Sequence, residues 1–369
     1  MEATVSLVTF GEKIALDKIE AAFQNFWRET SDAGSSEAVL KAATLNLIII
    51  LDDKTLYDEL LAGLQQIIAD HPGRIVIVYL NPESDLTDIE AHISAYSQKT
   101  KEQTQISAEV VILETSHAGS THLAGTILPL LLPDLPVYLW CPSYAALMNP
   151  HVRILFQFID RLIVSTPSEY DSPQQMAAMI DTLLALDREC KISDMSWSRL
   201  TDWREAVAQF FDVQENLKYL GLLDEVEITC AGDKLSNDAL LMAGWMASSL
   251  KSAAHAAAIQ DDSTIYFGRH QLSIKIRKKS INGRSGIRKI KLYAEEDEKA
   301  VIFTAMAIPD ECIQTILQKG GSQVTRYLYC KGQKKNIELL CAELDFLQQD
   351  QIYLNTCRII SEHLHENNS

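Results

Sequence analysis

The sequence predicts an α/β protein in which an open, doubly wound and mostly parallel sheet is followed by a smaller α+β domain. Two near-continuous apolar runs, at 45–51 and 74–80, are separated by one helical segment. That order is typical of a parallel βαβ unit whose strands are covered on both faces. Helical and strand patterns continue to alternate as far as about residue 190. Between 264 and 308 the pattern changes to alternating segments, which indicate an antiparallel meander.

We place the first domain at 1–215. Apolar residues at helical spacing from Leu16 to Trp27 predict a helix with one buried face. The segments 91–96 and 106–115 read as strands joined by a short polar link, which permits antiparallel pairing and hence a mixed sheet. The other expected elements are a helix to Ala69 capped by Thr55 with Asp58, a helix from Gly119 to Leu132, strands at 137–140 and 162–165, a helix at 151–159, and a helix capped by Asp202 with Glu205.

Three prolines interrupt an apolar stretch at 126–140 that carries one charge, Asp134. Proline fixes φ and removes a hydrogen-bond donor, so a helix must stop before Pro136 and a buried strand follow it. Asp134 either caps a turn or places a carboxylate at the carboxyl edge of the sheet, where α/β proteins bind ligands. The turn is favoured, because no base, metal pair or phosphate loop lies beside this residue.

We place the second domain at 216–369. It is expected to begin with a strand at 225–230 and a helix from Asn237 to about Ser252, capped by Ser236. Small residues such as Gly244 would let that helix lie close to a sheet. The meander comprises segments at 264–267, 271–277, 287–293 and 300–307, and a helix or helix pair at 337–360 ends the domain.

Composition disfavours several classes of protein. The net charge of −17, from 33 Lys and Arg against 50 Asp and Glu, disfavours nucleic-acid binding, which needs a basic surface. No run of 18 apolar residues is present, so we expect no membrane span. The N-terminus lacks the basic start and apolar core of a signal peptide, which favours a cytoplasmic location.

The sequence offers no recognisable catalytic, cofactor-binding or metal site. It contains no G-x-G-x-x-G, P-loop, G-x-S-x-G or H-E-x-x-H motif. His117 and His122 are five residues apart and do not share one helical face. The seven cysteines form no C-x-x-C pair, so we expect neither a metal site nor a disulfide framework, and most should be small buried residues in a reducing compartment.

Two clusters are candidate contacts with a partner protein. Trp197, Arg199, Trp203 and Arg204 fall within eight residues. Their rings and guanidinium groups either pack internally or form an anchor patch, because Trp and Arg are over-represented among interface hot spots.

The second cluster has eight basic residues and no acidic one. Its structural interpretation is a solvated sheet face with lysines guarding an edge. The alternative is a docking surface for an acidic partner or a phosphorylated ligand, helped by a turn at Gly283 and Gly286, with non-specific nucleic-acid binding ranked last. The cluster comprises Lys275, Arg277, Lys278, Lys279, Arg284, Arg288, Lys289 and Lys291.

Eight short motifs follow one another along most of the chain. They are Leu45-Asn46-Leu47, His71-Pro72-Gly73-Arg74, the stretch from Leu130 to Trp140, Asp160 to Val164, Trp197 to Thr201 with Trp203-Arg204, Phe211-Asp212, Ala239 to Trp245, and Glu343 to Phe346. In order and spacing, these motifs resemble the OpcA family of glucose-6-phosphate dehydrogenase assembly proteins. Where that family commonly has a second tryptophan after Trp140, this chain has Cys141.

The resemblance implies a non-enzymatic protein that binds glucose-6-phosphate dehydrogenase and promotes its active oligomer, feeding the oxidative pentose phosphate pathway. NADP would then belong to the partner, with no cofactor on this chain. An allosteric activator must bind the active state more tightly than the inactive one, and about 1–3 kcal/mol of coupling changes substrate affinity roughly 5- to 150-fold.

Two other functions remain open from the sequence. One is a sugar-phosphate binding protein or enzyme with a site at the sheet edge near Asp134 and Trp140, where basic groups hold the phosphate. The other is a passive scaffold without effect on activity. The sequence leaves the stoichiometry and the docking face undetermined.

Overall fold

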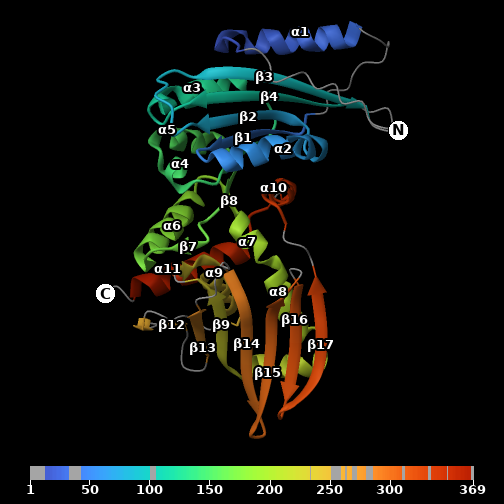
Figure 1. Cartoon of the computed structure of the whole chain (residues 1–369), viewed down its shortest axis with the longest axis vertical. Coiled ribbons are helices and arrows are strands. Elements are labelled where there is room, and N and C mark those ends of the chain that lie inside the picture. Colours follow the sequence, from blue (N-terminus) through green and yellow to red (C-terminus); the bar gives the residue numbers. More distant parts are fainter. Residues whose placement is uncertain are drawn as a thin grey trace. The chain divides into compact units, whose positions relative to one another are not determined.

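The computed structural model describes residues 13–32, 43–99, 105–232, 234–250, 259–261, 264–267, 272–279, 286–309, 312–330, 334–346 and 348–366. The chain divides into two compact units (Figure 1). Unit 1 comprises Met1–Ser165, Glu189–Ser193 and Asn336–Gln348, and unit 2 comprises Thr166–Arg188, Asp194–Lys335 and Gln349–Ser369. This division differs from the single boundary expected near residue 215, because the chain passes between the units several times.

Unit 1 is built on a seven-stranded mixed sheet in the order β3-β4-β2-β1-β5-β6-β8. Strand β1 pairs in parallel with β2 and β5, and β2 pairs in parallel with β4, whereas β3 is antiparallel to β4. These pairings confirm the expected βαβ unit and the mixed sheet. All residues of β1 and β2 are buried, as expected for strands covered on both faces. The strands are β1 (Leu45–Leu51), β2 (Gly73–Leu80), β3 (Glu90–Lys99), β4 (Gln105–Thr115), β5 (Val137–Cys141), β6 (Arg161–Val164) and β8 (Lys191–Asp194).

The helices of unit 1 follow the expected order with one change at a cap. Helix α2 is capped by Asp53, whose carboxylate accepts a hydrogen bond from the N–H of Leu56 at 2.7 Å. The expected cap, Thr55 with Asp58, is therefore wrong, because the helix begins two residues earlier than that cap requires and Asp58 pairs with Lys54. The helices are η1 (Leu16–Lys18), α1 (Ile19–Asp32), α2 (Lys54–Asp70), η2 (Ala118–His122), α3 (Leu123–Ile127), η3 (Leu128–Leu130), α4 (Tyr144–Met148), α5 (Pro150–Arg153), η4 (Ile154–Phe158) and α10 (Asn336–Asp345).

The proline-rich stretch forms a broken helix, a turn and strand β5, as predicted. Buried Asn46 in β1 fixes this corner: its Nδ2 donates to the carbonyl of Leu132 at 2.9 Å, and its Oδ1 accepts from the N–H of Leu132 at 2.8 Å. Asp134 lies exposed in the turn with φ of 62°. Because it precedes β5, it lies at the amino end of that strand, so the carboxyl-edge interpretation of Asp134 is wrong.

Unit 2 contains an eight-stranded sheet in the order β11-β12-β13-β9-β14-β15-β16-β17. Neighbours are antiparallel except for β13 and β9, which pair in parallel. The expected meander at 264–307 corresponds to β12 to β15, but it is not continuous, because β9 lies between β13 and β14. The continuous antiparallel run extends from β14 to β17, and its last two strands were not predicted. The strands are β9 (Leu223–Ala231), β11 (Ile259–Asp261), β12 (Thr264–Phe267), β13 (Ser273–Lys279), β14 (Gly286–Glu296), β15 (Lys299–Ile308), β16 (Cys312–Lys319) and β17 (Ser322–Cys330), with a separate pair β7 (Glu169–Tyr170) and β10 (Leu235–Ser236).

Capping in unit 2 is predicted correctly once and wrongly once. The hydroxyl of Ser236 accepts from the N–H of Ala239 and caps α9, as expected. Asp202 lies in the first turn of α8 instead of capping it, because α7 runs directly into α8 through Leu200. The helices are α6 (Pro173–Leu186), α7 (Met195–Arg199), α8 (Thr201–Ala208), η5 (Gln209–Phe211), η6 (Gln214–Gly221), α9 (Asn237–Ser249) and α11 (Gln351–Glu366), so the last segment of the chain is a helix pair, α10 and α11.

One face of the second sheet carries the core of unit 2. Phe303 in β15 meets the rings of Phe210, Phe211 and Tyr219 at centroid distances of 5.2, 5.2 and 5.7 Å. Helix α9 packs across β13, β9 and β14, and α8 packs on β15 and β16. A Cβ at Gly244 would lie 2.7 Å from Cγ1 of Ile360, so this small residue permits a close approach to α11. We call this side of the sheet the covered face.

Most of the cysteines are buried thiols. Cys141, Cys190, Cys230, Cys341 and Cys357 are free and buried, as expected for most of the seven, whereas Cys312 at the start of β16 is disulfide-bonded, which was not expected. Burial raises the pKa of the Cys141 thiol, which disfavours its reactive thiolate. The described ranges hold no group of three or more His, Cys, Asp or Glu side chains arranged for a metal ion. No helix within them is long and apolar enough to cross a bilayer.

Candidate functional site

The carboxyl edge of the first sheet is where a dinucleotide binds in doubly wound folds. The chain winds in opposite directions from β1, toward β2 on one side and β5 on the other, which makes this edge a topological switch point. The turn after β1 contains Asp52 and Asp53 where a phosphate-binding turn needs glycine. Asp53 already occupies the N-terminus of α2, and Asp52 accepts a hydrogen bond from the hydroxyl of Ser143.

Further carboxylates line the same edge beyond β2 and β4. Glu114, near the end of β4, accepts a hydrogen bond from Nδ2 of Asn81 at 2.9 Å. Tyr57 stacks on Tyr79 with ring centroids 4.7 Å apart, and burial together with the charge of Glu114 raises the pKa of Tyr57 to about 12. A helix N-terminus binds phosphate through its free N–H groups and its positive potential. At the N-terminus of α2, the carboxylate of Asp53 accepts a hydrogen bond from one N–H and offsets that potential. The residues therefore do not fit the pyrophosphate of a dinucleotide.

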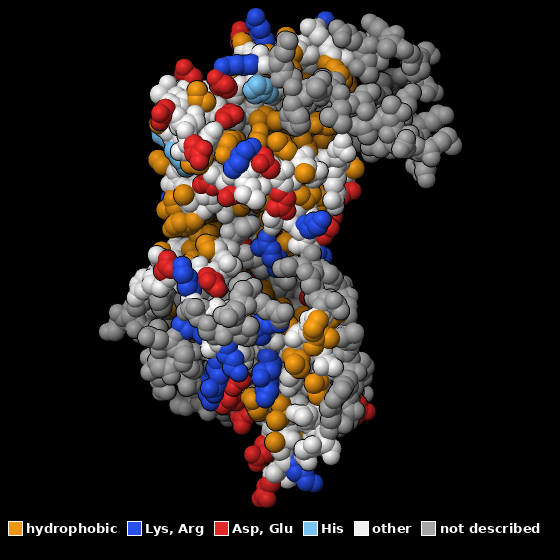
Figure 2. Space-filling model, in the orientation of Figure 1, with side chains coloured by type: hydrophobic (Ala, Val, Ile, Leu, Met, Phe, Trp, Pro, Cys, Tyr) orange, Lys and Arg blue, Asp and Glu red, His pale blue; other side chains and the backbone are white. Residues whose placement is uncertain are grey.

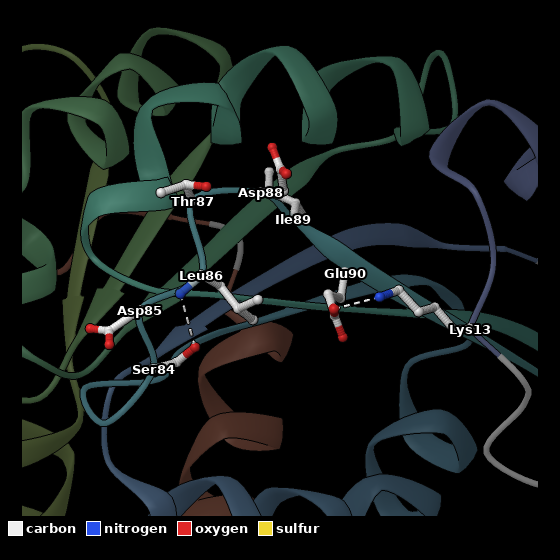
Figure 3. A pocket seen from close by; sticks show the side chains of 8 residues that line it. All are labelled: Lys13, Ser84, Asp85, Leu86, Thr87, Asp88, Ile89 and Glu90. Carbon is white, nitrogen blue, oxygen red and sulfur yellow. Dashed lines mark hydrogen bonds and ion pairs between the residues drawn. The ribbon is translucent and has the colours of Figure 1, made fainter.

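A hollow of about 610 Å³ lies between the loop after β2 and the start of β3. Figure 3 shows Lys13 paired with Glu90, and the N–H of Leu86 bonded to the hydroxyl of Ser84. Asp85 and Asp88 also line the hollow. With three carboxylates against one ammonium group, the hollow does not suit a sugar phosphate.

The Trp and Arg cluster divides into buried and accessible members. Trp197 is 4% exposed, its Nε1 donates to Asp350 at 2.8 Å, and the guanidinium of Arg204 lies 3.6 Å from its ring centroid. Arg204 also donates to the carbonyl of Trp197 at 2.9 Å. These two side chains support internal packing. Arg199 is exposed, and both Trp203 and Arg204 are half-buried. Because Arg204 stacks on Trp197, we take Arg199 and Trp203 as the candidates for a contact surface.

A buried polar network beneath this cluster was missed at the sequence level. The carboxylate of Asp194 accepts from the N–H and hydroxyl of Thr166 at 3.1 and 2.7 Å, from the N–H of Ser196 at 2.9 Å and from the hydroxyl of Tyr353 at 3.1 Å. Burial raises the pKa of Asp194, and these hydrogen bonds act in the opposite direction. An Asp directly before the helical residues 195–199 was the available signal for this cap.

The basic cluster is largely gathered on the side of the second sheet opposite the covered face, which we call the open face. Lys275, Arg277 and Lys279 alternate along β13 with buried Ile274 and Ile276. In β14 the corresponding positions are Lys289 and Lys291, since Ile290 and Leu292 are buried. Among the other three, Lys278 alternates onto the covered face beside Cys230, Arg288 lies at a bulge after Ile287, and Arg284, like Gly283, lies outside the described residues.

Strand β9 separates the two basic strands and adds two carboxylates to the open face. Glu225 pairs with Lys275, and Glu227 pairs with Arg277 at 2.9 Å. Burial, together with the like charges of Lys291 and Lys279, lowers the pKa of Lys289. The charge of Glu227, which lies opposite Lys291, acts on the pKa of Lys289 in the other direction. We call Lys279, Lys289 and Lys291 the lysine triad.

An apolar area adjoins the lysine triad on the open face. Tyr293 lies opposite Ile302, Lys289 opposite Met306, and Ile316 in β16 lies across from Thr304. Figure 2 shows basic side chains over β13, β9 and β14, with apolar side chains beside them over β15 and β16. The open face is therefore half cationic and half apolar.

The chain matches, in order, both domains of one protein family. Residues 64–181 match the glucose-6-phosphate dehydrogenase subunit N-terminal domain, and residues 190–357 match the C-terminal domain of the same subunit. The chain belongs to this family. Members of the OpcA family are therefore its relatives, as the motifs in the sequence indicated.

Two curated relatives are provisionally named OxPP cycle protein OpcA. The relative from Synechocystis sp. is 30% identical over 187 residues, which cover 50% of this chain and 38% of the relative. The relative from Synechococcus elongatus is 33% identical over 196 residues, which cover 51% of this chain and 42% of the relative. Each match therefore spans less than half of the relative's length.

A solved 3-ketoreductase from Actinomadura kijaniata shares the fold with a TM-score of 0.51 at 8% identity, over 88% of this chain and 96% of the reductase. That structure contains NADP. The shared fold does not by itself imply a shared cofactor. In this OpcA-family chain, carboxylates lie at the switch point, in the turn where the fold binds phosphates.

We expect the purified protein to show no saturable binding of NADPH at micromolar to millimolar concentrations. The reason is that Asp52 and Asp53 repel the pyrophosphate and Asp53 accepts a hydrogen bond from the N–H of Leu56 in the first turn of α2. Nicotinamide fluorescence measures the binding, and an NADPH-binding dehydrogenase serves as the positive control in the same buffer. Saturable binding in the micromolar range would show that the acidic turn does not exclude the cofactor.

Proposed function

We propose that this protein binds glucose-6-phosphate dehydrogenase in the cytoplasm and promotes its active oligomer as an allosteric activator, without catalysis of its own. The match of both halves of the chain to domains of a glucose-6-phosphate dehydrogenase subunit carries the proposal. The partner then supplies the NADP site and the chemistry of the oxidative pentose phosphate pathway.

The acidic switch point supports a non-enzymatic role. A dehydrogenase of this fold holds its cofactor at the carboxyl edge of the parallel sheet. In this chain, Asp52, Asp53 and Glu114 make that edge anionic, and Asp53 takes the helix N-terminus. This chain retains the fold, but its own carboxylates lie where the fold would bind a phosphate. Such a chain is suited to binding another protein.

The activation follows from differential binding. An activator raises the dehydrogenase's activity by binding the active oligomer more tightly than the inactive form. Coupling of about 1–3 kcal/mol changes the apparent affinity for glucose 6-phosphate roughly 5- to 150-fold. The coupling energy comes from contacts with the open face of the second sheet, to which exposed Arg199 and half-buried Trp203 are possible additions.

The structure weakens the alternative of a sugar-phosphate site near Asp134 and Trp140. Asp134 lies in an exposed turn before β5, whereas Trp140 is fully buried inside that strand. Their side chains do not line one accessible site. The basic groups that would hold a phosphate lie in unit 2, on a sheet separate from β5.

Steady-state kinetics of the cognate dehydrogenase, with and without this protein, test the proposal. We expect the apparent KM for glucose 6-phosphate to fall about 5-fold or more, since that is the lower end of typical coupling. Bovine serum albumin at equal concentration controls for non-specific stabilisation. An unchanged substrate dependence over a full titration would reject the activator and leave only a passive scaffold.

A further inference from the structure

The open face of the second sheet is available while the covered face is fully used. Val226, Ile228 and Phe303 lie on the covered face and are at most 2% exposed beneath the helices. Among the residues that alternate with them on the open face, Glu227 and Ile302 remain partly exposed, whereas Thr229 and Thr304 are buried. A sheet normally buries its apolar side chains against another layer, and sheets stack about 10 Å apart when they do.

The charge of the open face runs against that of the whole chain. Lys275, Arg277 and the lysine triad contribute five positive charges, whereas Glu225, Glu227 and, near the end of β14, Glu295 contribute three negative charges. Glu225 and Glu227 are paired with Lys275 and Arg277, and Glu295 lies beyond Tyr293, so the positive surplus lies on the triad. A local surplus on a chain of net charge −17 indicates selection of an acidic partner.

The apolar half of the open face gives the contact a second component. On the open face, Ile302 and Met306 lie on either side of Thr304 in β15, and Ile316 of β16 lies across from Thr304. Tyr293 of β14 lies opposite Ile302. Contiguous apolar patches on a protein surface mark sites of interaction. In such interfaces the apolar centre slows dissociation, while charges at the rim accelerate association.

We propose that the open face is the docking surface for the dehydrogenase, and that it takes an apolar patch bordered by carboxylates on that enzyme. The lysine triad meets the carboxylates, and Ile302, Met306 and Ile316 pack against the apolar patch. This inference rests on the proposed function, since it names the surface through which the two proteins associate.

Charge complementarity favours the dehydrogenase over a second copy of this chain as occupant. Two copies related by a twofold axis present the same patch to each other. Each copy brings its own lysine triad to that contact. The lysine triads then meet without a matching set of carboxylates, and like charges across an interface disfavour association.

A charge-reversal variant tests the cationic half. The variant Lys279→Glu, Lys289→Glu, Lys291→Glu is compared with Lys54→Glu, Lys191→Glu, Lys334→Glu, which changes the net charge equally at exposed lysines elsewhere. Binding to the immobilised cognate dehydrogenase is measured by surface plasmon resonance at 50 and 200 mM KCl. We expect the triad variant to associate at least about 10-fold more slowly and to lose the salt dependence, while the control variant behaves like wild type.

A conservative variant tests the apolar half. Ile302→Thr, Ile316→Thr keeps β-branched residues in both strands and so preserves strand propensity. Its control is Ile154→Thr, Leu217→Thr, which removes two exposed apolar side chains away from the open face. We expect the first variant to dissociate at least about 10-fold faster with an unchanged association rate, and the control to match wild type. Circular dichroism establishes that all four variants are folded.

The outcomes separate this inference from the proposed function. Wild-type binding that weakens only in the two open-face variants supports the inference. If wild type binds the dehydrogenase and both open-face variants bind equally well, the docking surface lies elsewhere and the proposed function stands. If wild type does not bind, the proposed function itself fails. A wild-type dimer in light scattering that the open-face variants convert to monomer would assign the face to a second copy.

Discussion

Replacing Glu109 by alanine is expected to lower the free energy of unfolding of unit 1 by about 3–5 kcal/mol. The change removes the buried carboxylate that pairs with the buried guanidinium of Arg74. Glu109 is 1% exposed and Arg74 is 3% exposed. Nε of Arg74 donates to Oε2 of Glu109 at 2.8 Å, and Nε1 of Trp27 donates to Oε1 at 2.7 Å. The loss therefore also affects the attachment of α1 to the sheet.

Chemical unfolding with urea, followed by far-UV circular dichroism, measures this loss. The matched control is Glu20→Ala, which removes a second carboxylate from the same guanidinium but one whose side chain is 48% exposed. Solvent screens that pair, so its removal is expected to cost within about 1 kcal/mol. Equal losses in the two variants would show that burial does not determine the strength of the Arg74 contacts.

Replacing Trp197 by alanine is expected to destabilise unit 2 by about 3–5 kcal/mol, the usual cost of removing a buried indole. The ring packs against Tyr353 at 5.6 Å, lies beneath Arg204, and donates to Asp350. Removal leaves a cavity and takes away the donor to Oδ2 of Asp350, whose Oδ1 still accepts from the N–H groups of Ile352 and Tyr353. Trp203→Ala, at a half-buried position, is the control and should cost about 1 kcal/mol.

These two variants, together with Trp197→Phe, separate internal packing from contact with the partner protein. Urea unfolding gives the stability of each variant, and binding of the folded protein to the dehydrogenase gives the contact. We expect Trp197→Phe to restore most of the stability and to bind like wild type. A Trp197→Phe variant that is fully stable and yet fails to bind would contradict the assignment of this ring to internal packing.

Much of the fold was predictable because local patterns determine it. The run at 45–51 could only be a central strand, since seven apolar or neutral residues in succession need cover on both faces. The prolines near Asp134 required a break before β5, and the structure shows that break. Alternation along β13 also predicts that Lys275, Arg277 and Lys279 share a face.

Tertiary relationships account for what sequence reasoning missed. Strand β9 pairs in parallel with β13 and antiparallel with β14, and no local pattern indicates that Glu225 and Glu227 separate the basic strands. The caps at Asp53 and Asp194 depend on where each helix begins, and a competing Thr or Asp lies within a few residues. The exposure of Trp197 and Trp203 likewise depends on packing against distant segments such as α11.

The central claim is that this protein and glucose-6-phosphate dehydrogenase associate directly. Sedimentation velocity of the two purified proteins, separately and mixed at increasing ratios, tests it most directly. We predict a species larger than either protein alone that contains both, whose amount saturates at a fixed ratio and thereby gives the stoichiometry. Two independent boundaries that keep their separate sedimentation coefficients at every ratio would contradict the claim.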